Sequence, residues 1–213
     1  MRFPENGLSS VVVVGTTRSD GSFSPKGTGF LAQVIRPDVG PVHYLVTAHH
    51  VIRDLPDPSK VSIRVNDSSV KVQELTSNGV FRWWRHPEDR NVDAAVFPWS
   101  LSPKEFPFVC FPGNRFLTPE IMNNKMIGVG DEIHMVGLFR HWSGRRQLIP
   151  MVRTGHLAMV ASERMSLKGK YPRPFMHLVE AFSLAGFSGS PVFVNETVAI
   201  PLRREHQDDA RWL

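Results

Sequence analysis

The sequence Gly186-Phe187-Ser188-Gly189-Ser190-Pro191 lies between two apolar runs, residues 176–184 and 191–194. Glycine permits backbone conformations that a Cβ atom forbids, so Gly186 and Gly189 allow a tight turn with Ser188 at its tip. Such a turn can direct the backbone N–H groups of Gly186 and Ser188 at one point, as an oxyanion hole requires. Clusters of Gly, Ser and Pro are also ordinary turn material. Taken alone, the stretch leaves a plain turn in a β protein open.

A serine hydroxyl is a poor nucleophile without a base that accepts its proton and a carboxylate that orients the base. Both groups occur upstream. Residues 44–52 place two histidines at the end of an apolar strand, and residues 91–97 place Asp93 at the start of another. The order along the chain is therefore His, Asp, Ser, which favours a serine enzyme over a plain turn.

Four motifs follow one another along the chain: Gly-Thr-Gly-Phe at 27–30, Thr-Ala-His-His-Val at 47–51, Asp-Ala-Ala-Val at 93–96 and the serine stretch at 186–191. Together they resemble the landmarks of the chymotrypsin-fold (trypsin-like) serine peptidases, and most of all the compact bacterial HtrA-like branch. The similarity runs from about residue 10 to about residue 195. It implies an all-β fold of two antiparallel six-stranded barrels, with the catalytic residues in the cleft between them.

The resemblance also implies which residues do the chemistry of a serine endopeptidase. In that family the base stands three residues after the threonine of the second motif, which selects His50 and leaves His49 as a spacer. Ser188 is then the nucleophile, Asp93 orients the base, and the backbone N–H groups of Gly186 and Ser188 form the oxyanion hole. Asp93 is preferred to Asp89 because an apolar run follows it directly, so that burial could shield the carboxylate from water. Asp89 is expected to be a solvated turn residue.

Two further expectations come from the same comparison with the family. Phe182 and Ser183 are implied as one wall of the substrate pocket. Phe187 stands where the trypsin subgroup has an acid. An activation switch that pairs a new N-terminal amine with that acid is therefore not expected, and the protease would be made ready-formed.

Composition agrees with a turn-rich β protein. The 213 residues include 16 glycines and 17 prolines, scattered between short β-branched runs, and 41% are apolar, which suffices for a core. Residues 101–125 hold four prolines without sustained periodicity, which indicates a linker with one short helix at 119–124. We expect the domains to be an N-terminal barrel at 1–100 with His50 and Asp93, the linker at 101–125, and a C-terminal barrel at 126–213 with Ser188. Strands are expected at 9–15, 27–34, 42–47, 61–66, 69–75, 93–97, 128–137 and 148–160.

Charge and residue counts limit the other functions. The net charge of +5 raises nucleic-acid binding as a question, but no nucleic-acid motif accompanies the arginines, so a nucleic-acid partner is not expected. The partner that the resemblance implies is a polypeptide substrate. The single cysteine, Cys110, excludes an intrachain disulfide, and its apolar neighbours indicate a buried, unreactive thiol in a strand. The histidines show no metal-ligand spacing, so neither a metal nor another cofactor is expected.

The two ends of the chain lead to separate expectations. The N-terminus lacks the charged flank and apolar core of a secretory signal, and no stretch is long enough for a membrane helix, so we expect a cytoplasmic protein that does not bind membranes. After residue 194 the sequence is mostly polar, and no apolar strand is visible for the other wall of the pocket. We therefore expect a second barrel that is incomplete at its C-terminus and self-associates through an open sheet edge.

An α/β-hydrolase is the rival serine enzyme. Ser190 occupies the position where the Gly-x-Ser-x-Gly motif requires glycine. That fold would also have to use His206, whose nearby acids Asp208 and Asp209 follow the histidine instead of preceding it. The alternative that remains open is a trypsin-like domain that has lost turnover and serves as a peptide-binding or scaffolding module.

Overall fold

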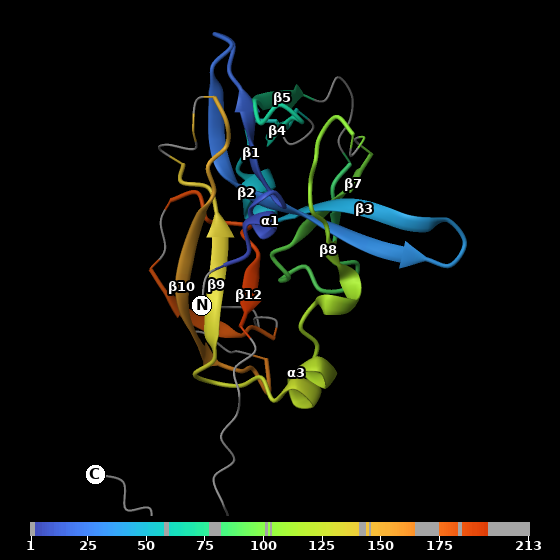
Figure 1. Cartoon of the computed structure of the whole chain (residues 1–213), viewed down its shortest axis with the longest axis vertical. Coiled ribbons are helices and arrows are strands. Elements are labelled where there is room, and N and C mark those ends of the chain that lie inside the picture. Colours follow the sequence, from blue (N-terminus) through green and yellow to red (C-terminus); the bar gives the residue numbers. More distant parts are fainter. Residues whose placement is uncertain are drawn as a thin grey trace, which may run out of the picture.

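The computed structural model describes residues 3–57, 60–76, 82–100, 102, 104–140, 144, 146–164, 175–182 and 185–195. Ser183, His206 and everything after residue 195 lie outside this range, and so do the predictions made for them. The described strands form two sheets that stand side by side (Figure 1). The all-β prediction is confirmed, and all but one of the strand pairings are antiparallel.

The first sheet has eight strands in the order β5-β4-β1-β2-β3-β7-β6, with β8 added to β2 in parallel. Glycine at position 40, with a φ of 81°, allows the tight turn between β2 and β3, whose hairpin extends away from the second sheet in Figure 1. The strands are β1 (Val11–Thr17), β2 (Phe23–Arg36), β3 (Gly40–Thr47), β4 (Ser62–Asn66), β5 (Val72–Thr76), β6 (Trp84–Arg85), β7 (Ala95–Trp99) and β8 (Phe111–Pro112).

The second sheet has four described strands in the order β11-β10-β9-β12. They are β9 (Glu132–Gly137), β10 (Met151–Met159), β11 (Leu178–Ala181) and β12 (Val192–Val194). The described strands therefore divide eight and four between the sheets, whereas six and six were expected. In this part of the chain β12 and β11 are the two edges of the sheet.

Strand β1 holds the two sheets together. Its four consecutive valines are all buried, with Val12 and Val14 in the core of the first sheet and Val13 against Leu138 and Leu148 of the second half. Because successive side chains of a strand point to opposite faces, an unbroken β-branched run suits a strand that is covered on both sides. The sequence of β1 thus explains its place between the two cores.

Four short helices complete the described fold: α1 (Glu5–Leu8), α2 (His49–Arg53), η1 (Gly113–Arg115) and α3 (Pro119–Lys125). The predicted helix at 119–124 is confirmed as α3. Thr118 caps it by accepting the N–H of Ile121, and Pro119 fits its first turn. No helix among the described residues is both long and apolar enough to cross a membrane.

Cys110 differs in one respect from its prediction. Residues 108–110 are not part of a ladder, and only Phe111–Pro112, in the segment expected to be a linker, pairs with β2. The cysteine nevertheless packs against the first core, where burial raises the pKa of its thiol to about 11. The predicted position of the thiol against the core is confirmed, and a thiol with this pKa stays protonated near neutral pH.

Candidate active site

His50 and Asp93 meet where two neighbouring strands begin and end. Thr47, the last residue of β3, pairs with Ala95, the first residue of β7, and α2 begins two residues later. Asp93 Oδ1 accepts the backbone N–H of His50 at 2.8 Å, and Asp93 Oδ2 lies 2.5 Å from Nδ1 of the same ring. A carboxylate at Nδ1 keeps the proton on that nitrogen, which leaves Nε2 as the ring atom able to accept a proton.

The aspartate is held by hydrogen bonds and not by burial. The Asp93 side chain is 52% exposed and the His50 side chain 38% exposed, so the expectation of a buried carboxylate is wrong. Burial begins two residues later, at Ala95, which is 0% exposed. The backbone carbonyl of Asp93 also accepts the N–H of His49 at 3.2 Å. The position of Asp93 is therefore fixed by two successive N–H groups at the start of α2, and not by apolar side chains covering it.

His49 has a different environment from its neighbour. Its backbone bonds to Asp93, but the ring that pairs with the Asp93 carboxylate is that of His50. Burial, followed by the positive charge of Arg85, lowers the pKa of the His49 ring. A neutral, partly buried imidazole fits the spacer position expected for it.

The serine turn has the backbone that its glycines predict. Gly186 has a φ of 107° and Gly189 a φ of 86°, both in the region that favours glycine. A Cβ at Gly189 would overlap Thr28 O and Thr47 Oγ1 and would lie 2.9 Å from Ala48 N. The turn therefore presses against the end of β3, directly before the histidine pair, and leaves Ser188 exposed.

Thr28, the second residue of the Gly-Thr-Gly-Phe motif, anchors this turn. Its backbone N–H donates to Ser188 O at 2.8 Å, and its hydroxyl donates to Gly186 O at 2.7 Å. The same hydroxyl accepts the N–H of Leu138 at 3.0 Å, and Thr47 Oγ1 donates to Thr28 O at 2.7 Å. One side chain of β2 thus joins the serine turn to Leu138, the residue directly after β9. The motif was visible in the sequence, but nothing in it indicated the role of this hydroxyl.

Further contacts hold the two expected oxyanion donors. The ring of Phe187 is buried, Ser190 N donates to Phe187 O at 3.0 Å, and Arg140 N donates to Ala185 O at 2.9 Å. Within the described part of the chain, no acceptor is found for the N–H of Gly186 or of Ser188. These are the two N–H groups that the resemblance implies as oxyanion donors.

Asp89 is more than a solvated turn residue, so that expectation needs correction. Its side chain is only 15% exposed and accepts the N–H of Asn91 at 2.9 Å and Arg164 Nη1 at 2.7 Å. Both bonds lower the pKa of the Asp89 carboxyl group, and the bond from the Asn91 N–H has the larger effect. Arg164 follows β10, so Asp89 ties the turn before β7 to the second half of the protein.

Phe182 lies directly after β11 and is 71% exposed, with the Arg153 guanidinium carbon 5.5 Å from its ring centroid. Its partner in the expected pocket wall, Ser183, is outside the described residues. Among the residues that the structure describes, no three His, Cys, Asp or Glu side chains come together as metal ligands.

Comparison with protein-family profiles finds no match, and neither does comparison with curated proteins. Among solved structures, the chain is similar to the apo crystal structure of the MamO protease domain from Magnetospirillum magneticum. The two are 15% identical, the similarity covers 89% of this chain and 80% of that one, and the TM-score is 0.59. A likeness at this identity concerns the fold, and it does not test the expected HtrA-like branch. The chain has the trypsin-like fold of a protease domain.

Proposed function

We propose that this protein is a serine endopeptidase that cleaves polypeptides through an acyl-enzyme. His50 Nε2 removes the proton from the Ser188 hydroxyl as its oxygen attacks a peptide carbonyl carbon. The carbonyl oxygen becomes an oxyanion that the N–H groups of Gly186 and Ser188 stabilise. When the C–N bond breaks, His50 returns the proton to the leaving amine. Water then hydrolyses the ester by the same steps in reverse.

The observation that carries this proposal is the placement of three motifs that are distant in the sequence. Asp93 holds His50 through both its backbone and its ring, and Gly189 packs the serine turn against the strand end that leads to this histidine. The proposal takes Ser188 to lie within proton-transfer reach of His50 when substrate binds, because catalytic hydrogen bonds often tighten only then.

A fluorophosphonate probe tests the proposal, because it reacts only with an activated serine. We expect one adduct, located by mass spectrometry at Ser188. Ser188→Ala and His50→Ala should abolish labelling, whereas His49→Ala should largely preserve it. Ser190→Ala is the matched control within the same turn, since the Ser190 hydroxyl oxygen is buried. An adduct elsewhere, or none from folded protein, would refute the enzyme.

The second candidate is the trypsin-like domain without turnover, a peptide-binding or scaffolding module. The half-exposed Asp93 favours it, because water competes for a carboxylate that lacks an apolar cover. A folded protein that binds peptides without being labelled would have this function. The cytoplasmic location stays a prediction under either function.

A further inference from the structure

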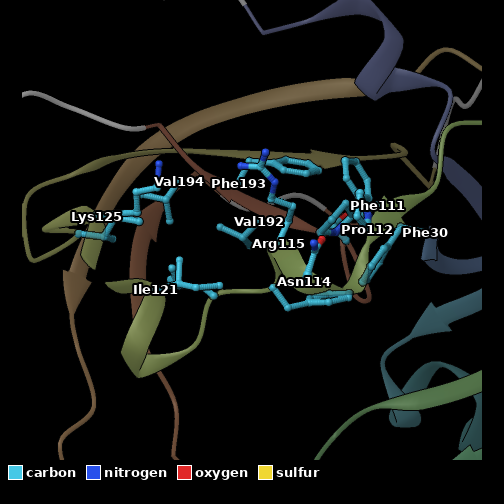
Figure 2. A pocket seen from close by; sticks show the side chains of 15 residues that line it. Phe30, Phe111, Pro112, Asn114, Arg115, Ile121, Lys125, Val192, Phe193 and Val194 are labelled. Atoms are coloured by element: carbon cyan, nitrogen blue, oxygen red, sulfur yellow. The ribbon is translucent and has the colours of Figure 1, made fainter. Parts of the chain in front are cut away.

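Arg153 of β10 lies on the core-facing side of the second sheet, where a cation is unusual. It pairs with Met135 of β9, and Met135 pairs with Val192 of β12, so these three side chains form one row across the sheet. On the same face of β10, Leu157 is 2% exposed and belongs to a core with Ile133. Figure 2 shows the other end of the row, where Val192 borders a hollow of about 710 Å³.

The charge of Arg153 has no counter-ion among the described residues. Its side chain is half-buried, and its Nε is a buried donor without a hydrogen-bond partner. The acids of the described strands in this sheet, Glu132 and Glu180, both pair with His156, so they lie on the opposite face. A buried donor without an acceptor costs free energy, and most such groups in folded proteins are partnered. An acceptor supplied by a bound molecule would remove this cost.

The Arg153 guanidinium also lies beside the expected substrate pocket. Its carbon is 5.5 Å from the ring centroid of Phe182, which the family resemblance implies as a pocket wall. The Phe182 side chain is 71% exposed, and it stands six residues before Ser188 in the chain. Attraction to the aromatic ring orients the guanidinium without neutralising its charge. The cation therefore stays available to an anion that approaches along the ring.

A second cation lies beside the serine turn itself. The backbone N–H of Arg140 donates to Ala185 O at 2.9 Å, and a Cβ built on Gly186 would lie 2.9 Å from Arg140 Cβ. The Arg140 side chain is exposed, and its guanidinium forms no hydrogen bond or ion pair with the residues that the structure describes. Two uncompensated positive charges thus lie near the turn, one beside Phe182 and one beside Gly186. Both favour a negatively charged group of the substrate.

We propose that Arg153 determines specificity by selecting substrates that carry an Asp or Glu side chain next to the scissile bond. This inference rests on the proposed endopeptidase function. The substrate carboxylate lies along the Phe182 ring and accepts hydrogen bonds from the guanidinium, whose planar fork matches a carboxylate. A Gln side chain in the same place leaves the cation unpaired, so the pocket distinguishes an acid from its amide. The exposed Arg140 adds only a weaker, salt-screened attraction.

Cleavage of a proteome-derived peptide library, read by mass spectrometry, tests the preference. We expect Asp and Glu to be enriched at one position next to the scissile bond. Quenched-fluorescence peptides with Glu or Gln at that position should differ about 10–100-fold in kcat/KM, as a hydrogen-bonded charge pair gives. Arg153→Gln should reduce this Glu/Gln ratio to below about threefold, and Arg153→Lys should retain part of it. The ratio is taken within each variant, so a general loss of activity does not change it.

A charge-matched control separates the pocket from the overall charge. Arg36→Gln changes a residue at the end of β2, in the hairpin that extends away from the second sheet, and should keep the ratio (Figure 1). Circular dichroism confirms that each variant is folded.

A binding assay with the full chain carrying Ser188→Ala tests the same pocket without turnover. Its probes are fluorescein-labelled Gly-Ala-Val-Glu-Ala-Val-Gly and the same peptide with Gln, followed by fluorescence anisotropy. We expect the Glu peptide to bind about tenfold more tightly, and Arg153→Gln to remove the difference.

Two results would overturn the proposal. The first is equal kcat/KM or equal binding for the Glu and Gln peptides; with fluorophosphonate labelling intact at Ser188, the proposed function would stand and only the acidic specificity would fail. The second is a preference for Glu that both Arg153 variants leave unchanged, or that Arg36→Gln removes equally. A chain that is not labelled but prefers the Glu peptide through Arg153 would fail as an enzyme and keep the acid-binding pocket.

Discussion

Replacing Thr28 by valine tests whether one hydroxyl organises the serine turn. Valine keeps the shape of threonine but removes the bonds to Gly186 O and Leu138 N. Thr28 is 0% exposed and Leu138 2%, so water does not readily replace those bonds. A buried donor left without a partner costs about 1–3 kcal/mol, and the less buried Gly186 carbonyl adds about 1 kcal/mol. We expect the free energy of unfolding to fall by about 2–4 kcal/mol.

Urea unfolding followed by tryptophan fluorescence measures this loss, and the rate of fluorophosphonate labelling measures the effect on the turn. Under conditions where Thr28→Val remains folded, labelling should slow by about 10²-fold, as for the loss of one oxyanion donor. Thr47→Val removes only the bond to Thr28 O and should cost about 1 kcal/mol. Thr16→Val, at a β1 residue whose hydroxyl bonds to no described group, is the control. If Thr28→Val costs less than about 0.5 kcal/mol and labels normally, the hydroxyl does not organise the turn.

Three other changes test separate features of the site. Gly189→Ala should lower the melting temperature far more than Gly21→Ala, because both have positive φ but only a Cβ at Gly189 meets other atoms; equal losses would contradict the packing of the turn. Asp93→Asn should lower kcat about 10⁴-fold in a peptide-hydrolysis assay without unfolding the protein, and unchanged kcat would exclude its orienting role. Burial and Arg85 lower the pKa of His49, so the unfolded chain binds this proton at higher pH than the folded chain. The free energy of unfolding should therefore fall as pH drops below about 6.5, and urea titrations should show a shallower fall for His49→Gln.

Local sequence patterns were sufficient to predict the backbone conformation wherever a residue's own neighbours determine it. The valine run predicted β1, the short helix predicted at 119–124 is α3, and two glycines allowed the positive φ angles of the serine turn. Strand propensity, capping and glycine's freedom act within a few residues, so they can be read from a single chain. The resemblance of four ordered motifs to the trypsin-like family, and not local conformational preference, made His50, Asp93 and Ser188 the candidates.

Only the tertiary structure decided how those segments meet. The Thr28 hydroxyl bonds to Gly186 across 158 residues and to Leu138 across 110, and Arg164 bonds to Asp89 across 75. Asp93 proved to be exposed because the hydrogen bonds from α2, and not the apolar run after it, hold it in place. Which strands pair likewise depends on the whole fold. Contacts between distant residues leave no periodicity or spacing in the chain, because each partner takes its position only after the sheets have packed.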